Sequence, residues 1–517
     1  MPDPSLSRAT RYVLLFGVIV SVLVRLPNLV SPLLDNHGFR QTQTAFTVQR
    51  YLTDGFSILH PQMPVFGPPW EVPFEFPLFQ LTAAVLAKLT GLEVDLACRV
   101  TGLLFFYVSA AMLFILCRRQ IGGRAAAIIV LAYLLNPFTV VWSRASLVEF
   151  AAVTFALAYV DLVLRWLSQP RSWKYLLLAI VCGSLGALTK ITTMAITVPP
   201  ILVFTLDRLF VFQGSKSRRG PAFFAIVTWL AITVIPVGVG QLWNHHADAI
   251  KQQMPLAQVL VSTYPTMIEW NFGTLAQRTH WSDWSTIFER IFRWLVMPSL
   301  CGMPFIALGA WPWISRSRRL FLVASLLGVL FPISLFFNLF AVHDYYLCAV
   351  SPFVAVLVGA GIDQTITLWQ TRSAPAVVRW GVCAAALAIA GGLILRTYQR
   401  AKGYLTASYT VDYTQPLVAI GEQIAKLGDG SEPVIFANKG DWDPSILYYA
   451  HRKGVLMWRH EPGMQTLLKD RFPIALVVIS EPSPEVLSLW RHKQLVTDSN
   501  DLQVWRVDDF VGQPANP

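Results

Sequence analysis

The stretch Leu33–Ala45, LLDNHGFRQTQTA, follows the first hydrophobic segment of the chain, residues 12–30. It brings an acidic, an imidazole and a guanidinium side chain close together, at Asp35, His37 and Arg40, with amides and hydroxyls behind them. Ionisable groups beside a hydrocarbon core are costly unless they are paired, hydrated or functional. The position of this stretch relative to a membrane therefore decides both the fold and the chemistry that the sequence predicts.

The composition is that of a membrane protein. Of the 517 residues, 54% are hydrophobic and 14% are charged, and the mean hydropathy is +0.50. A soluble domain is normally about a quarter charged. Runs long enough to cross a hydrocarbon core of about 30 Å recur between Arg11 and Arg396. Residues 12–30 lack a small-residue cleavage site, so a retained first helix is expected rather than a signal peptide.

The charge balance is basic, with 41 lysines and arginines against 30 acidic residues and a formal net charge of +11. Such an excess suits either nucleic-acid binding or the control of membrane topology. Each basic cluster lies in a short connection between apolar runs, as the positive-inside rule requires. The clusters are Arg118/Arg119/Arg124, Arg171/Lys174, Lys216/Arg218/Arg219, Arg316/Arg318/Arg319 and Arg372/Arg379. The lipid bilayer is therefore an expected partner and nucleic acid is not.

Placing all the basic clusters in the cytoplasm predicts a mainly α-helical, polytopic protein. The predicted spans, eleven in all, are residues 12–30, 100–117, 126–142, 148–167, 175–190, 191–212, 221–243, 291–314, 320–341, 347–370 and 378–396. A cytoplasmic N-terminus then puts loops 31–99 and 244–290 outside. Counting residues 76–92 as a span would invert every later basic loop, so an interfacial or re-entrant helix is predicted there.

Beyond the transmembrane domain, residues 1–396, the sequence becomes that of an ordinary globular domain. Residues 397–517 are predicted to form a small extracytoplasmic α/β domain, with strands at 432–438, 474–479 and 502–507. The segment DPSILYYAHRKG is predicted as a capped helix with Gly454 past its end. No GxGxxG, P-loop or nucleophile elbow occurs in this domain. A supporting or acceptor-docking role is expected.

The topology gathers ionisable residues from four distant segments at the outer membrane surface. They are Asp35, His37 and Arg40 after the first helix, Glu71 and Glu75 in WEVPFEFPL, Arg144 and Glu149 in WSRASLVEF, and His343 and Asp344 in VHDYY. A carboxylate can accept the proton of an attacking hydroxyl, and histidine and arginine can bind a phosphate. Group transfer from a lipid phosphate is therefore predicted.

Each of these residues also has a structural alternative. Asp35 is suited to a helix-terminal turn, Arg144 and Glu149 to a mutual ion pair, and Lys190 to snorkelling. His37 and His343 are each typical of interface or core histidines, and Glu75 of the edge of an interfacial helix.

The order of these motifs resembles the GT-C superfamily, and more narrowly the protein O-mannosyltransferase and aminoarabinose transferase group of bacterial inner-membrane glycosyltransferases. The resemblance covers residues 10–396 and rests on LLDNHGFRQTQTA, WEVPFEFPLFQ, CRRQIGGRAAA, NPFTVVWSRASLVEF, GSLGALTKIT and HDYYLCAVSPFVAVLVG. It implies a multi-pass protein of the bacterial plasma membrane that transfers a hexosyl or pentosyl group. The donor would be a polyprenyl-phosphate sugar, the transfer would be inverting and periplasmic, and the acceptor a glycan, lipid or protein.

The resemblance also implies roles for particular residues. Asp35 occupies the place of the catalytic carboxylate, and Glu149 that of a second acidic residue which binds sugar or tunes Asp35. Glu75 replaces the usual basic residue ahead of the interfacial helix, which leaves phosphate binding to Arg40, Lys190 or His343. His37, Arg144 and Tyr345 are further candidates for substrate binding. Some GT-C enzymes use a divalent metal, but no ligand set in this sequence requires one.

Other classes of membrane protein share some of these features. A transporter or lipid flippase also combines many helices with buried charge, but its polar residues would be expected near the bilayer midplane and in paired inverted repeats. A non-catalytic assembly or sensor protein and an oligosaccharide or polymer ligase are further alternatives. Consumption of a lipid-linked donor separates the enzymes from the transporters.

Overall fold

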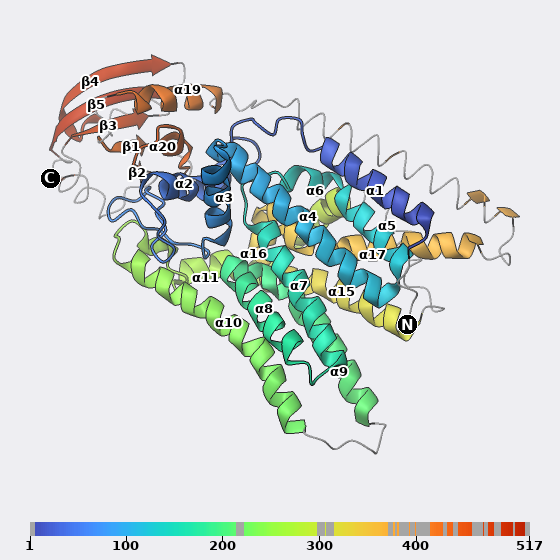
Figure 1. Cartoon of the computed structure of the whole chain (residues 1–517). Coiled ribbons are helices and arrows are strands. Elements are labelled where there is room, and N and C mark those ends of the chain that lie inside the picture. Colours follow the sequence, from blue (N-terminus) through green and yellow to red (C-terminus); the bar gives the residue numbers. More distant parts are fainter. Residues whose placement is uncertain are drawn as a thin grey trace.

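The computed structural model describes residues 6–213, 222–296, 315–370, 414–427, 432–437, 443–457, 474–479, 487–499 and 502–511, together with a few isolated positions. The predicted span 378–396 and most of the span 291–314 lie outside these residues. Long helices form one body, and a small sheet sits at one end of it beside helices α2 and α3 (Figure 1).

The described helices follow the order that the apolar runs predict. Their bounds are α1 Arg8–Leu23, α2 Gly38–Thr53, α3 Leu78–Thr90, α4 Val94–Ile121, α5 Gly123–Leu134, α6 Pro137–Trp142, α7 Glu149–Ser168, α8 Trp173–Met194, α9 Val198–Gln213, α10 Ala222–Gln252, α11 Pro265–Phe272, α12 Leu275–Thr279, α13 Trp281–Arg290, α15 Arg316–Leu335, α16 Phe337–Val342, α17 Leu347–Gln370 and α19 Thr414–Ala425. Short 3₁₀ turns lie at Ala195–Thr197, Gln258–Leu260 and Asp344–Tyr346, and a π-helical turn at Ile291–Leu295.

Among the described residues, five helical segments are long and apolar enough to cross a membrane. They are Val94–Ile121, Glu149–Ser168, Trp173–Arg208, Arg316–Leu335 and Asp344–Thr367. The mainly helical fold class is confirmed, and the count of eleven spans stays a prediction. The predicted boundary between residues 190 and 191 coincides with a break in α8, where Lys190 leaves the helical conformation with φ −166° and ψ 98°.

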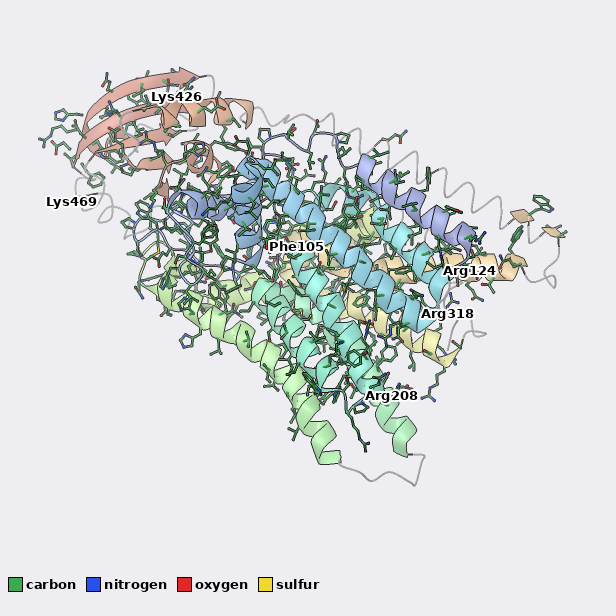
Figure 2. The ribbon with its side chains drawn as sticks, viewed as in Figure 1. Phe105, Arg124, Arg208, Arg318, Lys426 and Lys469 are labelled. Carbon is green, nitrogen blue, oxygen red and sulfur yellow. The ribbon has the colours of Figure 1, made fainter. Side chains whose placement is uncertain are left out.

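Basic residues from separate connections meet at the end of the bundle away from the sheet. Arg124 and Arg318, which begin α5 and α15, both bind Asp363 of α17, at 2.6 and 2.8 Å. Figure 2 places both arginines, with Arg208, at that far end. One end of the bundle thus carries basic clusters, as the topology prediction requires.

Residues after α19 form a five-stranded mixed sheet with the order β2-β1-β3-β5-β4. The strands are β1 Val434–Ala437, β2 Gly454–Met457, β3 Ile474–Ile479, β4 Trp490–Ser499 and β5 Leu502–Phe510. Strand β1 is parallel to β2 and β3, and β5 is antiparallel to β3 and β4. The three predicted strands are confirmed, whereas β2 and β4 were not predicted.

The predicted helix ahead of Gly454 is shorter than expected. Helix α20 covers only Ser445–Tyr449, and His451 then takes a left-handed conformation with φ 54°. Gly454 is not a helix terminator but the first residue of β2. A Cβ atom there would lie 2.0 Å from the carbonyl oxygen of Val434, so the close approach of β1 requires glycine at this position.

The sheet is extended by the segment between α2 and α3. The amide nitrogens of Gly454 and Leu456 in β2 donate to the carbonyl oxygens of Pro64 and Val65, at 3.1 and 2.9 Å. Side chains of α2, of this segment, of α20 and of the sheet share one hydrophobic core, which includes Phe46, Phe66, Ile446 and Val455. The C-terminal sheet therefore packs directly on the loop that carries Asp35.

Candidate functional site

Helix α2 organises the site, although the sequence did not predict it. It is rich in glutamine and threonine, yet every residue from Gln41 to Tyr51 is buried. One face packs on α20, where the hydroxyls of Thr42 and Ser445 lie 3.1 Å apart. Another face turns toward α3. Because neighbouring elements contact several faces of α2, the helix does not need a single apolar stripe. Its sequence therefore lacks the hydrophobic periodicity from which a helix is predicted.

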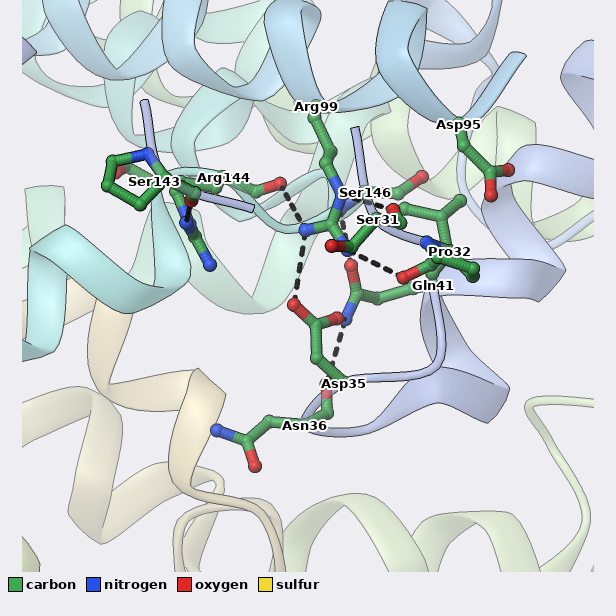
Figure 3. Close-up of polar contacts among 12 residues, drawn as sticks. Ser31, Pro32, Asp35, Asn36, Gln41, Asp95, Arg99, Ser143, Arg144 and Ser146 are labelled. Atoms are coloured by element: carbon green, nitrogen blue, oxygen red, sulfur yellow. Dashed lines mark hydrogen bonds and ion pairs between the residues drawn. The ribbon is translucent and has the colours of Figure 1, made fainter. Parts of the chain in front are cut away.

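Asp35 lies just before α2 and is held by two side chains (Figure 3). Its Oδ2 is 3.1 Å from Nη1 of Arg99, and its Oδ1 accepts a hydrogen bond of 2.5 Å from Nε2 of Gln41. The Arg99 side chain is 1% exposed, but that of Asp35 is 34% exposed. Arg99 and Gln41 thus orient the carboxylate, and part of its surface stays accessible to solvent.

The support of Asp35 extends into the turn between α6 and α7. Besides binding Asp35, Arg99 donates to the carbonyl oxygens of Pro32 at 2.8 Å and of Arg144 at 3.3 Å. Gln41 in turn accepts a hydrogen bond from the backbone nitrogen of Ser146 at 3.0 Å. The Arg144 side chain donates to the carbonyl oxygen of Pro27, and the structural alternative of an Arg144–Glu149 ion pair is not observed.

Glu149 pairs with Lys190 instead. The ammonium group donates to Oε1 of Glu149, and the two side chains are 5% and 2% exposed. Glu149 is the first residue of α7, where the helix dipole favours a negative charge. The break in α8 carries Lys190, whose Nζ lies 4.4 Å from the ring centroid of Tyr346 and 5.4 Å from that of Tyr345. The snorkelling alternative for Lys190 is wrong, because the side chain is buried.

Arg40 and Glu75 form a third ion pair. Nη2 of Arg40 donates to Glu75, and Nη1 donates to Oε1 of Gln43 at 3.0 Å. Burial by itself would raise the pKa of Glu75, but the positive charges of Arg40 and Lys190 hold it below its usual value. The backbone nitrogen of Phe76 donates to the carbonyl oxygen of Leu188, which ties this segment to the break in α8.

The aromatic turn after α16 contributes the remaining side chains of the site. Nε2 of His37 lies 3.0 Å from Oδ1 of Asp344, and its ring centroid lies 5.2 Å from that of His343 and 5.0 Å from that of Tyr345. Burial lowers the pKa of His343 to about 4, with a further contribution from the charges of His37 and Lys190. His343 is therefore neutral near neutral pH.

The structure thus brings most of the predicted residues into one electrostatic neighbourhood. The charges of Glu75 and Glu149 act on Arg40, and the charges of Arg40 and Lys190 act on His343. Sequence reasoning missed Gln41 and Arg99. Arg99 stands one residue before the predicted span 100–117, and an arginine at that depth is itself a signal of function.

The carboxylates of the site do not fit a metal centre. Asp35, Glu75 and Glu149 are each bound to a different cation. Within the described part of the chain, no group of three or more histidine, cysteine, aspartate or glutamate side chains is arranged to hold a metal ion.

Comparison with known proteins agrees with the fold. Residues 71–239 match the family described as dolichyl-phosphate-mannose-protein mannosyltransferase. No curated protein sequence matches the chain. Among solved structures, ArnT from Cupriavidus metallidurans bound to undecaprenyl phosphate is similar, with a TM-score of 0.62 and 15% identity over 98% of this chain and 100% of that one.

Two larger proteins are also similar. The oligosaccharyltransferase of Archaeoglobus fulgidus has a TM-score of 0.56 and 14% identity over 91% of this chain and 69% of its own. The arabinofuranosyltransferase AftD from Mycobacteria has a TM-score of 0.53 and 13% identity over 98% of this chain and 40% of its own. The resemblance inferred from the sequence is confirmed: the chain has the fold of the GT-C membrane glycosyltransferases.

Proposed function

We propose that this chain transfers a sugar from a polyprenyl-phosphate carrier to a hydroxyl of an extracytoplasmic acceptor, with inversion. The observation that carries the proposal is Asp35, a carboxylate just before α2 that is fixed by Arg99 and Gln41 yet one-third exposed. The match to the mannosyltransferase family and the undecaprenyl phosphate bound by the similar ArnT support the class of donor.

The proposed reaction is a single displacement. The acceptor oxygen attacks the anomeric carbon while the bond from that carbon to the phosphate oxygen breaks, and polyprenyl phosphate leaves with the bonding electrons. The hydroxyl proton passes to Asp35, which acts as general base. Attack from the face opposite the leaving group inverts the anomeric centre. Arg99 and Gln41 act as positioning residues because they fix both carboxylate oxygens.

Arg40 and Lys190 are the proposed phosphate ligands. Arg40 is partly buried and Lys190 is buried, at 13% and 5% side-chain exposure, and they reach the site from different elements. Preorganised positive groups stabilise the charge that develops on a leaving phosphate. His343 is assigned a hydrogen-bonding role, since its lowered pKa keeps it neutral. His37 and Tyr345 border the same space through their ring contacts with His343.

Glu149 is the proposed ligand for the transferred sugar. Its Oε1 is bound by Lys190, but its buried Oε2 has no hydrogen-bond partner among the described residues. A buried carboxylate oxygen without a partner is unfavourable, so a sugar hydroxyl that donates to it gains binding energy. Arg144 is assigned a supporting role, because its side chain binds the carbonyl oxygen of Pro27.

Donor consumption tests the proposed function. The purified chain in nanodiscs is incubated with decaprenyl-phosphate-linked hexoses and pentoses, and the release of decaprenyl phosphate is followed. Asp35→Asn is expected to lower turnover by about 10²- to 10⁴-fold, the usual contribution of a general base. Glu93→Gln, at an exposed carboxylate before α4, is the matched control. Near-normal turnover of Asp35→Asn would refute the assignment.

The proposed location has its own test. With the N-terminus in the cytoplasm, Asn36 faces the periplasm, beside the lipid phosphate. A membrane-impermeant maleimide is therefore expected to label Asn36→Cys in intact spheroplasts. Labelling only after the cells are opened would place the site on the cytoplasmic side and contradict the proposal.

A further inference from the structure

The C-terminal domain contacts the short segment that carries Asp35. Helix α20, Ser445–Tyr449, lies beside α2 (Figure 1). The hydroxyl oxygen of Tyr449, its last residue, accepts a hydrogen bond of 2.8 Å from the backbone nitrogen of Leu33. Leu33 stands two residues before Asp35 and is completely buried. Because water does not reach this backbone N–H group, the Tyr449 hydroxyl is the acceptor that satisfies it.

Helix α4 holds the same hydroxyl group from its other side. The Tyr449 hydroxyl donates to Oδ2 of Asp95 at 3.0 Å, and the hydroxyl of the neighbouring Tyr448 donates to Oδ1 of the same carboxylate. A hydroxyl that donates its hydrogen to a carboxylate keeps its lone pairs for an incoming N–H group. Asp95 therefore orients the Tyr449 hydroxyl so that it can accept the hydrogen bond from Leu33.

The same end of α4 also binds the segment directly. Arg99, which lies one helical turn after Asp95, donates to the carbonyl oxygen of Pro32 at 2.8 Å and lies 3.1 Å from Oδ2 of Asp35. Tyr449 holds the backbone N–H group that lies between these two points. The membrane domain and the C-terminal domain thus fix alternate groups of one short segment.

We propose that Tyr449 is a positioning residue for Asp35. Its hydroxyl fixes the backbone two residues before the carboxylate, so the C-terminal domain completes the active site without touching the substrate. This inference rests on the proposed function, in which Asp35 takes a proton from the attacking hydroxyl. A misplacement of about 1 Å in such a group can lower the rate by about 10²-fold, so a single backbone contact is able to affect turnover.

Tyr449→Phe and Tyr448→Phe form a matched pair of variants. Each keeps the ring and removes one hydroxyl that donates to Asp95, but only Tyr449→Phe takes the acceptor from the N–H group of Leu33. Both are expected to lower the melting temperature, since each leaves the carboxylate with one donor fewer. Only Tyr449→Phe is expected to lower kcat, by about tenfold, for a decaprenyl-phosphate-linked hexose or pentose. The KM for donor is expected to stay unchanged, because the groups that bind the donor are untouched.

Hydrogen exchange gives a second measurement that does not need activity. In the full-length protein in nanodiscs, Tyr449→Phe is expected to speed amide exchange in peptides that cover residues 33–37, while exchange in α17 stays unchanged. Tyr448→Phe is expected to leave exchange of residues 33–37 at the wild-type rate. A fall in kcat without faster exchange, or faster exchange without a fall in kcat, would overturn the proposal.

Two further results would also overturn it. If kcat fell equally in both variants, the loss of a donor to Asp95, and not the contact with Leu33, would be the cause. If Tyr449→Phe gave no folded protein while Tyr448→Phe did, the hydroxyl would serve stability, since a positioning role predicts a folded protein that reacts slowly.

Failure of this inference and failure of the proposed function give different results. If the wild-type protein consumes no lipid-linked sugar, yet Tyr449→Phe alone speeds exchange of residues 33–37, the transfer reaction is refuted and the hold of Tyr449 on the segment stands. If the wild-type protein consumes donors and Tyr449→Phe matches its kcat, only the role of Tyr449 is refuted.

Discussion

Two ion pairs of the site, Asp35–Arg99 and Glu149–Lys190, differ in what they leave open. In the first, the cation is buried and the carboxylate is 34% exposed. In the second, both side chains are at most 5% exposed. Arg99, which also binds backbone carbonyl oxygens, holds Asp35 so that its carboxylate stays accessible to solvent. Lys190, at the break in α8, holds Glu149 in a buried position. The first geometry suits proton transfer with an incoming hydroxyl, and the second suits charges that are fixed in place before the donor binds.

The largest expected effect comes from breaking the buried pair. Lys190→Met leaves the Glu149 carboxylate buried without its cation, and such a change costs about 3–5 kcal/mol. A lower melting temperature in detergent or nanodiscs is the measurement. Lys88→Met, at an exposed lysine in the last turn of α3, serves as the control.

A double substitution sharpens this test. Lys190→Met combined with Glu149→Gln removes both charges, so much of the lost stability is expected to return. If the single and double variants melted at the same temperature, the buried charge would not be the cause of the loss. Activity is expected to stay low in both, because a proposed phosphate ligand is missing.

An intermediate effect is expected at the open pair. Arg99→Lys keeps a positive charge but lacks the planar fork that binds Asp35 and the carbonyl oxygens of Pro32 and Arg144 together. We expect kcat to fall by about tenfold, or 1.4 kcal/mol, with the KM for donor unchanged. Steady-state kinetics with a lipid-linked sugar measures both constants. A rise in KM at constant kcat would mean that Arg99 binds substrate rather than positions Asp35.

The contrast between the pairs also explains what the sequence could predict. Charge placement and apolar runs predicted the helical order, and the unusual polar residues predicted which four segments meet. The cation that pairs with each carboxylate was not predictable. Arg99 lies in α4 and Arg144 in the turn before α7, and only tertiary packing decides which of them faces a carboxylate. The partner of Glu149, for which Arg144 was one alternative, is Lys190, from a segment 41 residues away.

Secondary structure was missed where tertiary contacts replace a local pattern. Helix α2 has no apolar stripe, because α20, α3 and α4 pack against it. Strand β4, WRHKQLVTDS, is an edge strand with mostly exposed residues, so its side chains do not alternate clearly. Strand β2 has only four residues and depends on Pro64 and Val65 of the outer loop for part of its pairing.

The smallest expected effect is a lower free energy of unfolding in acid, and it originates at the aromatic turn after α16. The pKa of His343 is lowered from 6.5 to about 4 in the folded chain. Between these pH values the unfolded chain therefore binds more protons than the folded chain. His343 does not lower the free energy of unfolding above pH 6.5, and it lowers it progressively as the pH drops toward 4. The lowered pKa of Glu75 acts in the same direction below pH 4.5, where the unfolded carboxyl becomes protonated. Acid thus disfavours the folded site through both groups.

His343→Phe isolates the histidine part of this effect. It keeps a ring against Tyr345 and removes the titrating group, so the melting temperature is expected to vary less between pH 7 and 5 than in the wild type. The difference is expected to be on the order of 1 kcal/mol, because the partly exposed imidazole is screened by solvent. His280→Phe, at the loop position just before α13, is the control. Equal slopes in the wild type and both variants would show that acid acts elsewhere in the chain.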